Sequence, residues 1–86
     1  MNTKITTIRE LKVRLSHQLE AVKSERMAAQ DRLKARREND ADHDRKYYVE
    51  SSVLLTRARE YAAMEQETET LWSKEVWVLS LLGDLI

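Results

Sequence analysis

The stretch RRENDADHDRK, from Arg36 to Lys46, decides whether this chain folds as one helix or as two. It contains no large apolar residue, so a helix built from it would have no hydrophobic stripe to bury. Asn39 suits the left-handed position that ends many helices, and the aspartates after it can cap a following helix. We therefore predict a turn over about 39–43.

The alternative is one continuous helix, which a chain with no Pro and a single Gly would permit. The charge distribution favours the turn. Residues 1–38 carry ten Lys or Arg and five acidic residues, whereas residues 39–86 carry five Lys or Arg and ten acidic residues. Halves of opposite charge attract each other when they lie side by side, although each exposed pair adds only about 0–1 kcal/mol.

The first half predicts a helix over about 5–38 with a thin apolar stripe. Thr7 and Glu10 match a capping box, and Thr3 is a competing start one turn earlier. The stripe recurs at steps of three and four residues, as one face of a helix does. Its members are Ile8, Leu11, Leu15, Leu19, Val22, Arg26, Ala29 and Leu33, so one arginine interrupts it.

The second half predicts a helix over about 44–83. Pairs of residues 11 apart occur in both halves, for example Leu11 with Val22 and Leu71 with Leu82. An 11-residue repeat favours a nearly straight or slightly right-handed seam over a left-handed heptad coil. We therefore expect the two helices to pack along each other with this rhythm.

The turn position also predicts which residues face each other. In a hairpin centred near residue 41, position i lies opposite about 82 − i. This register brings an acidic group beside a basic group, namely Glu65, Glu67 and Glu69 beside Lys12, Arg14 and His17.

Together these patterns predict an all-α fold with two long helices in an antiparallel coiled-coil-like hairpin. The chain of 86 residues forms one helical domain over 1–86. A chain this short buries a modest share of its surface, and without Cys it has no disulfide to stabilise it. We therefore expect it to dimerise or to dock on another protein.

The segment KEVWVLSLLGDLI, Lys74–Ile86, is the most apolar part of the chain. In the predicted register the start of the first helix lies opposite about residues 75–78, so the tail extends beyond that helix. We expect Gly83 to end the second helix, and Leu85 and Ile86 to fold back on its last turn. A helix that is apolar all round must be buried all round, and each large side chain gains roughly 1.5–3 kcal/mol on burial. We predict that a partner protein or a second copy covers this segment. The candidate partner-binding residues are Leu71, Trp72, Val76, Trp77, Leu79, Leu81 and Leu82.

No pattern in the sequence predicts catalysis, a cofactor or a metal ion. The chain lacks a phosphate-binding glycine loop and a nucleophile–His–acid set. His43 and its neighbouring aspartates lack the spacing and the Gly of a calcium loop, so we interpret them as a solvated turn. We expect no enzymatic activity, no cofactor and no metal site.

Nucleic-acid and membrane binding are also disfavoured. The basic run Arg32, Lys34, Arg36 and Arg37 has no interleaved aromatic residue, so we interpret it as a solvated face. The longest apolar run, Val76–Leu79, is far shorter than the roughly 20 residues of a spanning helix. The N-terminus has no apolar signal-peptide core. These features favour a cytoplasmic protein.

The function that the sequence favours is a protein–protein interaction module. We expect a small helical regulator, antagonist or adaptor that binds a partner protein through its apolar C-terminal segment, by analogy with small accessory factors of phages and other mobile elements. One alternative is a coiled-coil subunit that only assembles with itself. Another is a helical dimer that binds nucleic acid through the basic face of its first helix.

Overall fold

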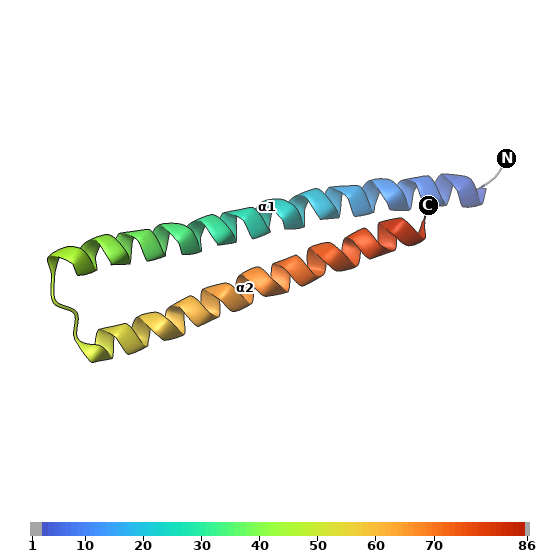
Figure 1. Ribbon diagram of the computed structural model, residues 1–86. Helices are drawn as coiled ribbons and strands as arrows, with labels where there is room; N and C mark the ends of the chain where they lie inside the picture. Colours follow the sequence, from blue (N-terminus) through green and yellow to red (C-terminus); the bar gives the residue numbers. More distant parts are fainter. Residues whose placement is uncertain (1–2, 86) are drawn as a thin grey trace.

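The computed structural model describes residues 3–85, and the side chains of residues 7–85. It shows two helices packed side by side in opposite directions (Figure 1). Helix α1 spans Thr3–Lys46 and helix α2 spans Ser51–Asp84, with lengths of 44 and 34 residues. The molecule is a rod of 71 × 17 × 13 Å. The predicted all-α helical hairpin is confirmed, and the single continuous helix is excluded.

The predicted turn over 39–43 is wrong. That segment lies inside α1, and the chain reverses over residues 47–50. Tyr47, Tyr48 and Val49 are aromatic or β-branched residues, which lose side-chain freedom in a helix and are weaker helix formers. The last turn of α1 carries basic side chains, which interact favourably with the negative end of the helix dipole.

Helix α2 begins after an extended residue. Glu50 has φ −70° and ψ 151°, and its carbonyl accepts hydrogen bonds from the N–H groups of Val53 and Leu54 at 3.1 and 3.2 Å. At the other end, α2 ends at Asp84, one residue beyond the predicted end at Gly83, and this glycine has no positive φ. Ile86, which was predicted to fold back on the last turn, lies outside the described residues.

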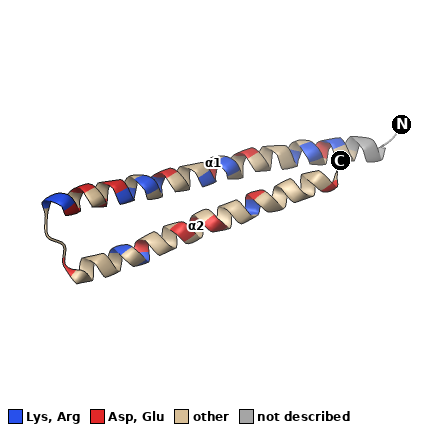
Figure 2. Cartoon of the chain, in the orientation of Figure 1, with Lys and Arg blue, Asp and Glu red and all other residues tan. Residues whose placement is uncertain are grey.

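The polar segment of α1 stays helical because α2 pairs with its charges. Asp40 accepts hydrogen bonds from Arg36 at 3.1 Å and from the Tyr61 hydroxyl, and its carboxylate lies 3.8 Å from Nε of Arg57. Asp44 accepts two contacts from Nη1 of Arg57, at 2.8 and 2.7 Å. Charged residues accordingly occur on both helices in the half nearest the turn (Figure 2). The interpretation of residues 40–44 as a solvated turn is therefore wrong.

These contacts shift the pKa values of the groups involved. The hydrogen bond from Tyr61 is the main cause that lowers the pKa of Asp40. The bond from Arg57 lowers the pKa of Asp44, and the bond to Asp40 raises the pKa of the Tyr61 phenol. The folded hairpin therefore favours both carboxylates in their charged form and the phenol in its neutral form.

Ion pairs between the helices define the register. Arg26 pairs with Glu75, Arg32 with Glu67, Arg37 with Glu65 and Arg36 with Glu60. The numbers of paired residues add to about 100, so residue i of α1 lies opposite about 100 − i of α2. The predicted register of 82 − i is wrong, because the chain reverses later than predicted. The acidic stretch of α2 therefore meets the basic run of α1 and not the residues near His17.

The contact face of each helix follows a heptad. On α1 the buried Leu15, Val22 and Ala29 are seven residues apart. On α2 most buried and half-buried positions recur at alternating steps of four and three, at Arg57, Tyr61, Met64, Thr68, Leu71, Glu75, Val78, Leu82 and Leu85. Glu60 and Leu81 are half-buried beside this row. The predicted 11-residue repeat is wrong. Residues 11 apart also occur in a heptad pattern, across steps of four, three and four, so such pairs alone do not distinguish the two repeats.

Protonation of the aspartates in the turn half should destabilise the hairpin. Folding lowers the pKa of both carboxyl groups. They therefore stabilise the folded state at any pH above their pKa in the unfolded chain, about 3.9. This stabilisation is lost as the pH falls through their lower pKa in the folded state. We expect the urea midpoint, followed by circular dichroism, to fall on acidification. Asp40→Asn combined with Asp44→Asn should lower the midpoint at neutral pH and reduce its fall in acid. Asp31→Asn, at an exposed position of α1, should change neither, and an equal effect in this control would contradict the assignment.

Removing one partner of the Arg26–Glu75 pair should destabilise the hairpin more than removing both partners. Both side chains are largely buried, with 17% and 12% exposed. Removing one partner leaves an uncompensated charge, so we expect Glu75→Leu to cost about 3 kcal/mol, whereas Arg26→Leu with Glu75→Leu should be near neutral. The exposed pair Arg32–Glu67 is the control, since its loss should cost about 0–1 kcal/mol. Additive losses in the double variant, measured by urea unfolding, would refute this expectation.

Candidate protein-binding surface

The apolar C-terminal segment lies against α1 and does not overhang it. Val78 is 1% exposed and is the most buried large side chain among the described residues. Figure 1 shows that α1 extends past the C-terminal end of α2, which is the reverse of the prediction. The physical reason is the later turn, since α1 runs to Lys46 and leaves α2 the shorter helix.

The seven predicted partner-binding residues fall into two groups. Leu71, Leu81 and Leu82 are half-buried, and Leu71 and Leu82 lie on the heptad positions that contact α1. The other four remain exposed, namely Trp72 at 57%, Val76 at 44%, Trp77 at 61% and Leu79 at 50%. Sequence reasoning did not include Val78, the residue that anchors this part of α2 to α1. Whether the exposed four bind a partner stays a prediction.

Three of the exposed residues share one flank of α2. Trp72, Val76 and Leu79 are spaced i, i+4 and i+7, which places them in a row on one side of a helix. We call these three residues the distal stripe. Trp77 projects from the opposite flank, since it is offset by one residue from Val76 and by two from Leu79. The segment that looked apolar all round therefore has a buried face and two exposed flanks.

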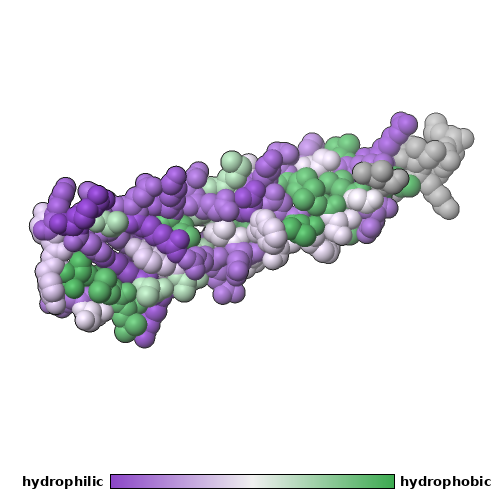
Figure 3. All heavy atoms as spheres, viewed as in Figure 1, coloured by the Kyte–Doolittle hydropathy of each residue, from purple (hydrophilic) through white to green (hydrophobic). Residues whose placement is uncertain are grey.

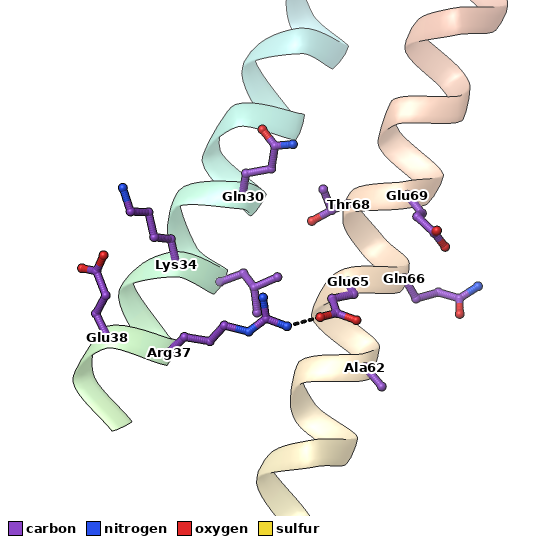
Figure 4. Close-up of a pocket in the computed structure, with 10 residues that line it drawn as sticks. Gln30, Lys34, Arg37, Glu38, Ala62, Glu65, Gln66, Thr68 and Glu69 are labelled. Carbon is purple, nitrogen blue, oxygen red and sulfur yellow. Dashed lines mark hydrogen bonds and ion pairs between the residues drawn. The ribbon is translucent and has the colours of Figure 1, made fainter. Parts of the chain in front are cut away.

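A polar groove lies between the two helices (Figure 4). Glu65 and Glu69 line it from α2, and they precede Trp72 by one and two turns on the same row. Lys34 and Arg37 line it from α1. Arg37 pairs with Glu65 across the groove, and its guanidinium lies 5.5 Å from the centre of the Tyr61 ring. The groove has a volume of about 660 Å³ and its polar side chains come from both helices.

The basic run of α1 is engaged by α2. Three of its four members pair with glutamates across the seam, as Arg32–Glu67, Arg36–Glu60 and Arg37–Glu65. Arg32, Lys34 and Arg37 remain exposed, as predicted for a solvated face, but α2 partly compensates the charges of the run. Pairing lowers the positive potential that a nucleic acid would meet, because phosphate binding depends on uncompensated Lys and Arg charges.

The described residues offer no clustered metal ligands. No group of three or more His, Cys, Asp or Glu side chains lies together there in a way that could hold a metal ion. His43 instead contacts its neighbours, with Nδ1 3.2 Å from Oδ1 of Asp44 and its ring centre 4.9 Å from that of Tyr47. The chemistry available at the distal stripe is burial of apolar surface beside paired charges.

Sequence reasoning missed a second apolar surface at the turn end. Tyr47, Tyr48, Val53, Leu54 and Leu55 are all exposed, and Tyr48 is 90% exposed. Figure 3 shows hydrophobic residues gathered at the start of α2 and again over the distal half of the hairpin, with hydrophilic residues between them. The signal in the sequence was the run Val53-Leu54-Leu55, which no single amphipathic face can bury.

Comparison of the chain with protein-family models, with curated proteins and with solved structures finds no match. Within the described residues, neither helix combines the length and the hydropathy that crossing a bilayer requires.

Introducing a charge at two adjacent residues of α2 should change the free energy of unfolding by very different amounts. Val78→Asp places a carboxylate in the seam and should cost about 3 kcal/mol or more, because a buried unpaired charge is among the most destabilising changes. Leu79→Asp lies on the exposed distal stripe and should stay within about 1 kcal/mol of the wild type. Thermal and urea unfolding of the two variants would test this, and similar losses in both would contradict the described orientation of α2.

Proposed function

We propose that this chain is a non-enzymatic protein-binding module that acts through the distal stripe. It covers an apolar surface of a partner protein with Trp72, Val76 and Leu79, as a small regulator, antagonist or adaptor would. The observation that carries the proposal is the contrast along one helix. Val78 is fully buried, while the three stripe residues beside it stay about half exposed on a single flank.

The stripe has the composition of a binding hot spot. Trp is enriched among the few residues that supply most of the energy of protein interfaces. Each large apolar side chain gains roughly 1.5–3 kcal/mol when it passes from water to a buried position. The stripe is also presented on a helix held in place by the seam, so binding would cost little ordering of the backbone. Paired charges next to it would favour one orientation of the partner.

One alternative is an assembly subunit whose only partner is a second copy. The observation that favours it is the presence of exposed apolar residues at both ends of α2, at Leu54 and at Leu79. Nucleic-acid binding is not proposed, because most of the basic run is paired within the hairpin.

Site-specific photo-crosslinking tests the proposal in the cells that make this chain. A benzophenone amino acid replaces Trp72 in one variant and Trp77 in a matched control, which has the same residue type, a similar exposure and the opposite flank. We expect adducts from position 72, identified by mass, and few from position 77. Adducts with another protein support a regulator or adaptor, whereas adducts with a second copy support an assembly subunit. No adduct at position 72 would refute the proposed function.

A further inference from the structure

The distal stripe is one end of a longer row along α2. Counting back from Trp72 on the same flank, the row passes Glu69 and Glu65 and reaches Ala62, which lines the same groove as the two glutamates. Ala58 and Leu54 follow at steps of four, and both are exposed. The row therefore has three apolar members at each end and two acidic members in the middle.

The two apolar ends of this row are complementary in size. Leu54, Ala58 and Ala62 at the turn end mirror Leu79, Val76 and Trp72 at the distal end. The midpoint of each mirrored pair falls at about residue 67, so one two-fold axis near that point relates all three pairs. Ala62 then lies opposite Trp72 and Ala58 opposite Val76, while Leu54 meets Leu79. A small residue opposite a large one allows two helix surfaces to interdigitate.

We propose that a second copy of this chain docks antiparallel on this row, with α2 against α2 and the two-fold axis near residue 67. The inference rests on the proposed function in its assembly form, in which the partner that covers the distal stripe is a second copy of the chain. The contact is isologous, so the turn end of each copy covers the distal stripe of the other. Both exposed ends of the row are buried by a single contact.

The polar groove lies at the centre of this contact. Glu65 and Glu69 of each copy approach those of the other, and each pair of acids is accompanied by Arg37 and Lys34 of its own α1 (Figure 4). Glu38 lines the groove as well, so the centre contains three acidic and two basic groups from each copy. The centre opposes a shift in register, because such a shift would place a glutamate against an apolar end.

The flanks of α1 are complementary in charge under the same axis. The axis crosses α1 near residue 33, which lies opposite residue 67 in the register of the hairpin. Glu20 and Lys23 lie on the row of α1 that continues through Met27 and Gln30 to Lys34. They then lie opposite Arg45 and Asp42 of the second copy, respectively, so that each meets the opposite charge. Arg45 and Asp42 also contact each other within their own helix, at 3.9 Å.

A size-swap experiment tests the pairing of Ala62 with Trp72. Light scattering and sedimentation over a range of concentrations give the dimer dissociation constant. We expect Trp72→Ala and Ala62→Trp each to raise it by about tenfold or more. Combining Ala62→Trp with Trp72→Ala restores the complementary sizes and should return it to within about threefold. Both positions are exposed, and circular dichroism checks that each variant folds. Additive weakening in the double variant would overturn the pairing.

Single cysteines test the orientation, because the chain contains no other cysteine. Ser51 and Gly83 are mirrored about residue 67, and a Cβ at Gly83 meets nothing within 4 Å. An oxidised mixture of the Ser51→Cys and Gly83→Cys chains should contain the mixed disulfide in excess of either self-linked product. Self-linked Gly83→Cys as the main product would indicate a parallel dimer and overturn the proposal.

The two proposals can fail separately. A chain that stays monomeric at the highest soluble concentration, and whose position 72 crosslinks to a different protein, overturns the dimer and leaves the binding function standing. A monomer with no crosslink from position 72 overturns both.

Discussion

The position of the turn in this hairpin depends on one shared cation, Arg57, which contacts both Asp40 and Asp44 across the seam. A polar segment with no large apolar residue would otherwise have little reason to stay helical. Because α2 satisfies these carboxylates, α1 continues to Lys46 and the chain reverses only over 47–50. The late reversal shortens α2 and sets the register of about 100 − i. That register in turn places Val78 against α1 and leaves the distal stripe on the surface.

The two halves of the contact between the helices differ in composition and in what they contribute to the fold. Near the turn, charged and polar side chains occupy heptad positions, including Arg36, Asp40 and Tyr61. Away from the turn, the buried positions are apolar, apart from the Arg26–Glu75 pair. Apolar contacts supply most of the favourable free energy of such an interface, whereas polar groups at seam positions restrict which register is possible. The hairpin therefore combines a stabilising distal half with a turn half that favours one alignment.

This division also explains where a partner can bind. A two-helix hairpin buries only one face of each helix, so apolar residues beyond that face stay exposed. On α2 they continue as a flanking row that carries Trp72, Val76 and Leu79 at one end and Leu54 at the other. Of the two acids in the middle of the row, Glu65 pairs with Arg37 of α1. A surface with apolar ends and a charged centre suits a partner of matching length, and a second copy of the chain offers one.

The sequence by itself determined the helical class and the hairpin, because helix-forming composition, apolar periodicity and opposite charge in the two halves are local or additive properties. It also indicated that the C-terminal segment carries apolar surface, but it missed the exposed apolar residues at the turn end. Only the tertiary structure decided the turn, the register and the division of that segment into buried Val78 and exposed Trp72. The turn and the register depend on which charges meet across the seam. The residues around Asn39 do not by themselves indicate that Arg57, on the other helix, pairs with Asp40 and Asp44. A shift of the turn by a few residues moves every facing pair, so an error there carried over to the tail.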